Sequence, residues 1–498
     1  MTLETLLKDL NIHLTPKELR LPITGIACHS KQVKPGNLFI AVKGPTTDGA
    51  SYIPEALKRG AKGVIAEQDF TSDTETVKVI VKDAREILAI LSHRFYNAPS
   101  EKLRVVGITG TNGKTTVSYL IEALLKEAGY GVGVIGTISH RMGGRAIPAQ
   151  NTTPGILEVQ SLLSQMVKEK ADYAVMEVSS HALDQKRIDK IHFEVAVFTN
   201  LAEDHLDYHK TEEAYFLAKR KLFESLDEKA TAVLNADSPY CERIALVTRA
   251  RILTHGLTKK ADISATSLKL SSQGIYFDAV TPSGKLEIQS HLIGTYNVYN
   301  ILSALSVGLC QGIPLSTLQK GIGSLKGVPG RLERVEAGQP FKVFVDFAHT
   351  EDALRQVLLS LRELTPGRIL LVFGCGGDRD RTKRPRMAET AGKLSEWVVV
   401  TSDNPRNEDP RKILKEIEAG FGPFENYRLE EDRTKAILAA LLSAEKGDTV
   451  LIAGKGHEAY QIFRDRVVPF DDRQVAYEIL SHSRDSQGHE RALTSRRN

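Results

Sequence analysis

The chain has 498 residues, and 66 lysines and arginines against 62 aspartates and glutamates give a formal net charge of +4. At roughly 150 residues per domain the length suggests about three domains. A composition of 41% hydrophobic and 26% charged residues is typical of a folded globular chain and excludes a long disordered or fibrous one. With so small a basic excess, we do not expect a nucleic-acid backbone as a partner.

The cysteines and the N-terminal segment indicate the compartment. The four cysteines are widely separated and form no CxxC pair, so neither a disulfide framework nor a zinc site is predicted, and we expect reduced thiols. No apolar run approaches the ~20 residues of a membrane span, and residues 1–30 lack the pattern of a signal peptide. We therefore expect a cytoplasmic protein with no membrane partner.

Residues 1–100 are predicted to form a small α/β domain. Short apolar runs at 38–42, 63–66 and 77–81 are separated by turns that contain Gly and Pro. The polar segment Asn97-Ala-Pro-Ser100 marks the end of this domain, because a pattern of alternating strands and helices begins after it.

Residues 101–333 are predicted to form a central domain around a parallel sheet covered on both faces. The run Val105–Ile108 predicts a buried strand. The apolar positions that follow it have a 3.6-residue period, which predicts a helix that Gly129 ends. Further buried strands are predicted at 173–178, 195–198 and 232–234.

Residues 334–484 repeat the alternation, with strands predicted at 343–345, 369–373, 398–401 and 450–453. This pattern indicates a C-terminal Rossmann-like, doubly wound domain. Residues 485–498 are polar and aperiodic, and we expect them to be disordered. The fold class is thus α/β with three domains.

A phosphate-binding loop is predicted at Gly107–Thr116, between a strand and a helix. Glycines let backbone N–H groups approach phosphates, Lys114 can reach the β and γ oxygens, and the Thr115 hydroxyl can bind Mg²⁺. Five residues separate Gly107 from Gly113 where the strict pattern has four, so this is a variant of the loop. The alternative, a glycine-rich turn with a solvated lysine, fits the strand and helix context poorly.

Polar residues at the ends of neighbouring strands predict a cation site beside this loop, because ligands of parallel sheets bind at the carboxyl ends of strands. Glu177 interrupts a buried apolar run, and His205 lies in a polar segment after the strand at 195–198. A buried carboxylate needs a cation or a hydrogen-bonding partner. Taken singly, Glu177 is equally explained as a salt-bridged core acid, and His205 as an ordinary loop histidine.

In this order the motifs resemble those of the Mur ligases, the ATP-dependent amide-forming enzymes of peptidoglycan precursor synthesis. The resemblance extends over about residues 20–484. The matching motifs are Gly110-Thr-Asn-Gly-Lys-Thr-Thr116, Asn151-Thr-Thr-Pro154, Met176-Glu-Val-Ser-Ser-His181, Thr199-Asn-Leu201, Asp204-His-Leu-Asp-Tyr-His209, Ala218-Lys219, Asn297-Val-Tyr-Asn300, Gly330-Arg-Leu-Glu333 and Asp346-Phe-Ala-His-Thr350.

Within that family the chain resembles the enzymes that add the third amino acid to UDP-N-acetylmuramoyl-L-alanyl-D-glutamate. The resemblance implies that meso-diaminopimelate is that amino acid and that it is bound by Arg379, Asp403, Asn404, Pro405, Arg406, Gly454 and Glu458. Diaminopimelate differs from lysine by a second carboxylate, which an arginine fork binds with two hydrogen bonds. Taken alone, Asp403-Asn-Pro-Arg406 favours a strand-end turn with a solvated arginine, but within this series of motifs it favours the substrate-binding role.

The resemblance also implies the remaining ligands. ATP is expected at Gly110, Thr111, Asn112, Gly113, Lys114, Thr115, Thr116, Asn297, Asn300, Arg331 and Asp346. The UDP-muramoyl-dipeptide is expected at Cys28, Ser30, Pro45, Thr46, Thr47, Asn151, Thr152, Thr153, Ser179, Gln185 and Arg187.

For the chemical step, the resemblance implies catalytic roles for Lys114, Glu177, His205 and Lys219. Lys219 is expected to be carbamylated by CO₂ (N6-carboxylysine), and Mg²⁺ is expected at Thr115, Glu177, His205 and the carbamate. From the residues alone, an ordinary helix-surface lysine beside Arg220 and Lys221 is the favoured interpretation of Lys219. We expect small-molecule substrates only and a monomer.

Several positions depart from the family pattern. His29 and Lys31 flank Ser30 where Asp and Arg are usual, Ala202-Glu203 precedes Asp204, and Phe347 and Glu351 replace Tyr and Pro. None of these changes removes a phosphate or metal ligand. Three alternatives stay open: a lysine-adding ligase, a folylpolyglutamate synthase without a uridine-binding first domain, and a regulatory P-loop ATPase.

Overall fold

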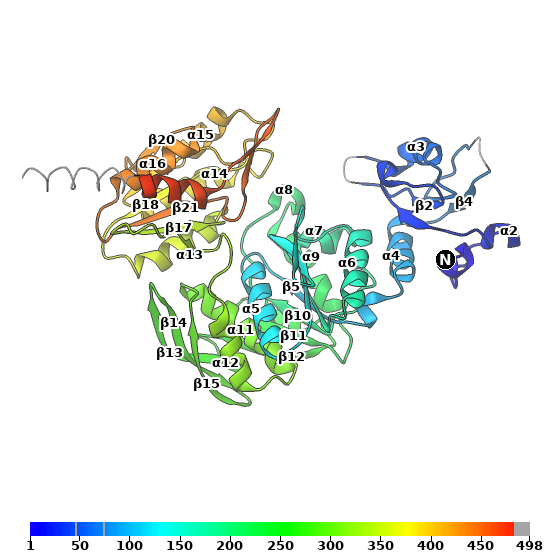
Figure 1. Cartoon of the computed structure of the whole chain (residues 1–498), viewed down its shortest axis with the longest axis horizontal. Helices are drawn as coiled ribbons and strands as arrows, with labels where there is room; N and C mark the ends of the chain where they lie inside the picture. Colours follow the sequence, from blue (N-terminus) through cyan, green and yellow to red (C-terminus); the bar gives the residue numbers. More distant parts are fainter. Residues whose placement is uncertain (45–46, 73–74, 483–498) are drawn as a thin grey trace, which may run out of the picture.

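The computed structural model of the chain describes residues 1–44, 47–72 and 75–482. The candidate residues Pro45 and Thr46 and the tail at 485–498 therefore lie outside the described residues. Figure 1 shows three α/β domains in chain order, with the central one linking the other two. Within the described ranges, no helix is both long and apolar enough to span a bilayer.

The N-terminal domain is built on a parallel sheet of strand order β1-β2-β3-β4. Helix α4 packs on one face of it and α3 on the other. The predicted strands at 38–42, 63–66 and 77–81 are confirmed to within two residues. The elements are α1 (Leu3–Leu7), α2 (Pro16–Leu19), β1 (Gly25–Ala27), η1 (Ser30–Gln32), β2 (Asn37–Ile40), η2 (Gly49–Tyr52), α3 (Ile53–Lys58), β3 (Gly63–Ala66), β4 (Val77–Ile80), α4 (Ala84–Phe95) and η3 (Pro99–Glu101).

The central domain contains a sheet of strand order β15-β14-β13-β12-β11-β10-β5-β9-β6-β7-β8. The predicted strands are confirmed as β5 (Arg104–Thr109), β9 (Tyr173–Glu177), β10 (Val195–Phe198) and β11 (Thr231–Asn235), and the predicted helix as α5 (Lys114–Glu127). The other strands are β6 (Val132–Ile135), β7 (Ser139–Met142), β8 (Arg145–Pro148), β12 (Arg251–Gly256), β13 (Ile263–Ser271), β14 (Gly274–Thr281) and β15 (Gly284–Ser290). The other helices are α6 (Ile156–Lys168), α7 (Ser180–Asp184), α8 (Leu206–His209), α9 (Glu212–Glu224), α10 (Cys241–Ala245), α11 (Thr295–Cys310) and α12 (Leu315–Ser324).

Both faces of the parallel part of this sheet are covered, as predicted. Helices α5, α11 and α12 bury apolar side chains on one face, and α6 and α9 do so on the other. The predicted parallel sheet is extended at its two edges by strands that the sequence did not predict, where β13–β15 and β6–β8 pair antiparallel. In β14, buried and half-buried positions alternate, which is typical of antiparallel strands with one solvated face.

The C-terminal domain has the predicted doubly wound sheet, with strand order β16-β17-β21-β18-β19-β20 and parallel pairing except at β16. Its core lies on both faces. The elements are β16 (Glu333–Arg334), β17 (Lys342–Asp346), α13 (Glu351–Arg362), β18 (Ile369–Phe373), α14 (Lys383–Leu394), β19 (Trp397–Val400), α15 (Pro410–Glu418), β20 (Tyr427–Leu429), α16 (Arg433–Ser443), β21 (Thr449–Ala453), β22 (Tyr460–Ile462) and β23 (Val467–Pro469).

Candidate active site

The phosphate loop lies between β5 and α5, as the sequence predicts. Gly110 and Gly113 have φ angles of +148° and +87°, which favour glycine, and Gly113 is the N-cap of α5. A Cβ at Gly113 would overlap the side-chain oxygen of Asn300. The loop thus brings the helix N-terminus against α11, and this approach leaves room only for backbone.

Two lysines converge on one carbonyl oxygen of this loop. Nζ of Lys114 donates to the carbonyl oxygens of Gly110 and Thr111, each at 2.8 Å, and Nζ of Lys219, from α9, also donates to the Gly110 oxygen at 2.8 Å. Lys219 is 1% exposed. Burial lowers the pKa of Lys219 well below its usual range, and the neighbouring Lys114 ammonium lowers it further. Lys219 is therefore a core lysine and not the helix-surface lysine that the sequence alone favoured.

Glu177 ends β9 beside the loop and is 1% exposed. Its Oε2 accepts hydrogen bonds from the hydroxyls of Thr115 at 2.9 Å and Thr137 at 2.8 Å, and its Oε1 accepts from the Thr137 backbone N–H at 3.0 Å. All of these donors are neutral. These hydrogen bonds compensate in part for the hydration that the buried carboxylate loses.

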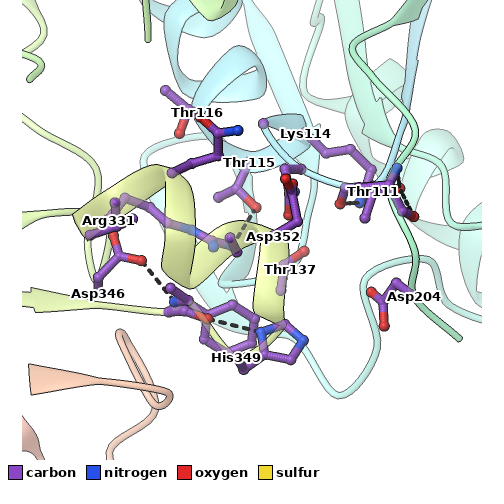
Figure 2. Close-up of a pocket in the computed structure, with 18 of the residues that line it drawn as sticks. Thr111, Lys114, Thr115, Thr116, Thr137, Asp204, Arg331, Asp346, His349 and Asp352 are labelled. Atoms are coloured by element: carbon purple, nitrogen blue, oxygen red, sulfur yellow. Dashed lines mark hydrogen bonds between the residues drawn. The ribbon is translucent and has the colours of Figure 1, made fainter. Parts of the chain in front are cut away.

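Arg331 reaches the same point from the segment before β16. Its Nη2 donates to the Thr115 hydroxyl at 3.2 Å, and its guanidinium lies 4.6 Å from the ring centroid of Phe347. The Asp346 carboxylate accepts the backbone N–H of Leu332 at 2.6 Å and so anchors the residue after Arg331. Figure 2 shows Arg331 extending towards Thr115, with Asp346 beside it.

One cavity of about 680 Å³ is lined by residues of the central and C-terminal domains, a volume in the range of small-molecule sites. The predicted ATP residues Asn297 and Asn300 line it and hydrogen bond to each other at 2.8 Å. At the other end it is lined by the predicted amino-acid residues Arg379, Asp403, Asn404, Arg406, Gly454 and Glu458. Pro405 is not among its lining residues.

His205 lines this cavity beside Asp204. Burial lowers the pKa of His205 to about 3, although the Asp204 carboxylate favours the protonated form. The imidazole is therefore neutral near pH 7, which is the form that binds cations.

The predicted muramoyl-dipeptide residues fall into two groups. Thr153, Ser179, Gln185 and Arg187 form one hydrogen-bonded network, in which Arg187 donates to Oε1 of Gln185 and to the carbonyl of Thr153. Thr152 lines the cavity. Cys28, Ser30 and Thr47 lie in the N-terminal domain, where the Ser30 hydroxyl donates to Glu55 at 2.7 Å. Arg85 joins the two groups, because it donates to the carbonyls of Lys43 and Gln185.

Comparison with known proteins decides the family. Three family models match: the Mur ligase family catalytic domain over residues 22–96, the Mur ligase middle domain over 108–308, and the Mur ligase glutamate ligase domain over 330–456. The UDP-N-acetylmuramoyl-L-alanyl-D-glutamate–2,6-diaminopimelate ligase of Caldanaerobacter subterraneus subsp. tengcongensis is 43% identical over 97% of this chain and 100% of its own. The chain belongs to the Mur ligase family.

Solved structures agree with this assignment. A structure of a UDP-N-acetylmuramoyl-L-alanyl-D-glutamate–2,6-diaminopimelate ligase superposes with a TM-score of 0.70 at 33% identity, covering 97% of this chain and 99% of that one. The MurF ligase of Thermotoga maritima in complex with ADP has a TM-score of 0.64 at 21% identity over 94% and 99% of the two chains, a likeness of fold alone.

The residues of this Mur ligase fit a magnesium ion. Thr115, Thr137 and Glu177 present hydroxyl and carboxylate oxygens, the ligands that Mg²⁺ prefers. Among the described residues no group of three or more His, Cys, Asp or Glu is arranged to hold a metal. A site completed by hydroxyls and substrate phosphates agrees with that finding, because Mg²⁺ is seldom bound by protein ligands alone.

Some residues of the Mur ligase site were missed from the sequence. Thr137 follows β6, a strand that the apolar pattern does not predict. The sequence therefore gives no sign that Thr137 is a polar residue at the end of a buried strand. Asp352 accepts from Nδ2 of Asn112 at 3.1 Å across the two domains. No sequence signal marks such a contact, because it depends on how the domains meet.

Proposed function

We propose that this Mur ligase joins meso-diaminopimelate to UDP-N-acetylmuramoyl-L-alanyl-D-glutamate with hydrolysis of ATP, as a step of peptidoglycan precursor synthesis. Its partners are these small molecules, and it works as a cytoplasmic monomer. We place the domain boundaries near residues 100 and 333, with a third boundary near 484. In this division the first domain binds uridine, the second ATP and the third the amino acid.

The observation that carries the proposal is that two arginines and two acids line the same cavity as the phosphate loop. Arg379 and Arg406 lie there with Asp403 and Glu458. Burial lowers the pKa of Arg406, and the neighbouring Arg379 guanidinium lowers it further, so this end of the cavity favours an anion. A substrate end that carries both an ammonium and a carboxylate matches acids and arginines side by side.

ATP binds with its phosphates on the loop 110–116, its adenosine towards Asn297 and Asn300, and Arg331 and Asp346 beside it. Thr115, Glu177, His205 and the carbamate of Lys219 would hold Mg²⁺. When bound, Mg²⁺ offsets negative charge on the phosphates. Lys114 does the same from the loop once its ammonium exchanges the Gly110 and Thr111 carbonyls for phosphate oxygens.

The carbamate of Lys219 is supported by burial and by charge. Addition to CO₂ needs a neutral amine, which burial supplies. The product is an anion, and it would lie beside the Lys114 ammonium. Carbamylation would therefore replace a neutral amine by a group that attracts that ammonium.

The reaction proceeds in two steps. An oxygen of the D-glutamyl γ-carboxylate attacks the γ-phosphorus of ATP, and ADP leaves. The amino group of diaminopimelate then attacks the acyl carbon, loses a proton, and inorganic phosphate leaves as the amide forms. The chain positions these groups and stabilises their charge. Closure of the C-terminal domain protects the acyl phosphate from water.

The muramoyl-dipeptide extends from the first domain to this cavity, with Cys28, Ser30 and Thr47 at the uridine end. Asn151, Thr152, Thr153, Ser179, Gln185 and Arg187 hold the peptide end. The four-stranded N-terminal sheet, which a folylpolyglutamate synthase is expected to lack, favours a nucleotide-linked substrate.

The test offers the purified protein UDP-muramoyl-L-Ala-D-Glu and MgATP with either meso-diaminopimelate or L-lysine, and mass spectrometry identifies the product. We expect the diaminopimelate tripeptide, with repeated turnover of ATP to ADP only when all substrates are present. A lysine tripeptide would favour the lysine-adding alternative. ATP turnover that responds to a macromolecule and yields no tripeptide would favour a regulatory ATPase.

A further inference from the structure

Lys455 is a buried ammonium next to the amino-acid end of the cavity. It follows β21 and Gly454, its side chain is 0% exposed, and it does not line the cavity. Its Nζ donates to Oδ1 of Asn404 at 3.2 Å and to Oε2 of Glu458 at 3.1 Å. A buried ammonium is retained only where such partners compensate for lost hydration. Lys455 is therefore tied to two residues that do line the cavity.

The hydrogen-bonding groups of Asn404 are directed inwards. Oδ1 accepts from Lys455 and also from the backbone N–H of Ile462 at 3.0 Å, and Nδ2 donates to Oε2 of Glu458 at 2.8 Å. Asn404 is 1% exposed. Its amide thus forms part of a frame around Glu458, in which each member holds the other two.

Glu458 is the member of this frame that brings a carboxylate to the cavity. Both of its side-chain partners, Asn404 and Lys455, are bonded to Oε2. In the described part of the chain no protein donor is paired with Oε1. Asp403 and Arg406 line the same end of the cavity. One carboxylate oxygen is therefore fixed from inside the protein, and the other remains for a ligand.

We infer that Lys455 is a positioning residue for the amino-acid substrate. It fixes Glu458 so that Oε1 receives an ammonium of the incoming amino acid, while Arg406 takes the carboxylate on the same carbon. This inference rests on the proposed function and adds to it a residue that acts through Glu458. A preorganised carboxylate binds an ammonium better than a mobile one, because its side-chain entropy is lost when the protein folds and not when the ligand binds.

Two variants test the inference. Lys455→Met removes the ammonium at similar volume, and Lys455→Gln keeps a neutral donor. With meso-diaminopimelate varied, we expect KM to rise at least about tenfold in Lys455→Met and about threefold in Lys455→Gln, since a charge-assisted hydrogen bond is lost or weakened. The kcat value and the KM values for ATP and UDP-muramoyl-dipeptide should change less than about twofold, because those ligands bind elsewhere.

A double-mutant cycle separates positioning from a structural effect. On a Glu458→Gln background, Lys455→Met should raise the KM for diaminopimelate less than about twofold, because the residue through which Lys455 acts has lost its charge. Full additivity of the two changes would overturn the inference.

A matched control keeps stability apart from binding. In the wild type, Nη2 of Arg368 donates to Oδ2 of Asp448 at 2.7 Å, at the opposite end of β21 from Lys455. Arg368→Met removes this cation. It should lower Tm and leave the KM for diaminopimelate unchanged. The inference is overturned if either folded Lys455 variant keeps the wild-type KM for diaminopimelate, or if all three KM values rise together. A wild-type enzyme that adds no diaminopimelate contradicts the proposed function instead.

Discussion

The central and C-terminal sheets both end at the cavity, yet they hold their buried cations differently. In the central domain Lys114 and Lys219 donate to the Gly110 carbonyl, and among the described residues neither is paired with a carboxylate. In the C-terminal domain Arg433 pairs with Asp472 at 2.7 Å, and Lys455 pairs with Glu458 at 3.1 Å. In the part of the chain that the structure describes, the central region thus holds buried amino groups that have no carboxylate partner, and in the C-terminal region each of these cations is paired with a carboxylate.

This difference matches the ligands proposed for each region. A nucleoside triphosphate brings several negative charges, so a site in which Lys114 has no carboxylate partner within the described chain gains attraction that an already paired site would lack. A zwitterionic amino acid brings both signs, and a paired network with one free carboxylate oxygen and one arginine fork suits it. Substitutions that remove charge should therefore act on ATP chemistry in one region and on amino-acid choice in the other.

The largest effect is expected for Lys114→Ala. Without the loop ammonium, charge on the transferring phosphoryl group is not offset, and ligation should fall by at least about 10⁴-fold. Calorimetric binding of UDP-muramoyl-dipeptide should persist, since it uses other residues. Lys126→Ala, at the far end of α5 and paired with Glu122 at 2.7 Å, is the control and should be near wild type. If a folded Lys114→Ala protein lost both ligation and binding of UDP-muramoyl-dipeptide, the proposed division between ATP and dipeptide sites would be contradicted.

Lys219→Ala should lower ligation by about 10³-fold, because the variant cannot form the carbamate that we propose as an anionic ligand of Mg²⁺. Formate or acetate in the buffer should restore part of the activity by supplying a carboxylate in the space left. Lys221→Ala, which removes a half-exposed lysine of the same helix that pairs with Asp184, is the control. Normal turnover of Lys219→Ala would show that this buried lysine has only a structural role.

Arg406→Ala tests the paired region. Removing a bidentate partner and stranding the carboxylate should lower kcat/KM for meso-diaminopimelate by at least about 10²-fold. Lysine has no carboxylate there, so its kcat/KM should change little or rise. Arg406→Lys should recover part of the loss, because an ammonium cannot form both parallel hydrogen bonds. Arg411→Ala, which removes an exposed arginine of α15 that pairs with Glu431, serves as the control.

If Arg406→Ala lowered kcat/KM equally for diaminopimelate and for lysine, the arginine would have a different role. Arg406 has a φ of +52°, a strained value for a residue with a side chain, and its Nη1 donates to the Gly377 carbonyl at 2.9 Å. A general loss of activity would mean that these features hold the strand-end turn together.

The sequence predicted those features that depend on residues close together along the chain, and it missed those that depend on distant residues. Buried parallel strands such as β10 and β18 were located to the residue, because their apolar runs and the turns that flank them are local signals. The edge strands β13–β15 were missed, since alternating half-buried strands give a weaker pattern. The family motifs, rather than periodicity, suggested the residues of the cavity.

The burial of Lys219 could not be predicted from its own neighbours. In sequence it lies beside Arg220 and Lys221, which indicates a solvated helix face, yet in the fold it lies against the Gly110 carbonyl and the Tyr215 ring. The ion pair of Arg433 and Asp472 could not be predicted either, because these residues are far apart in the sequence and meet only in the folded C-terminal domain.

The smallest effect is expected where the two regions touch. Glu203, which departs from the family pattern, forms an ion pair with Arg386 of α14 across the cleft, and both side chains are partly exposed. Such a pair contributes about 0–1 kcal/mol, so Glu203→Gln should lower kcat/KM by no more than about fivefold. The wild-type value should also fall as NaCl is raised, and that salt dependence should weaken in the variant. The charge-swapped double variant Glu203→Arg with Arg386→Glu should regain activity and salt dependence together. If Glu203→Gln instead lowered kcat/KM as much as Arg406→Ala, the contact between the domains would matter to the reaction as much as Arg406 does. The contrast between the unpaired lysines described for the central domain and the paired cations of the C-terminal domain would then not account for the activity.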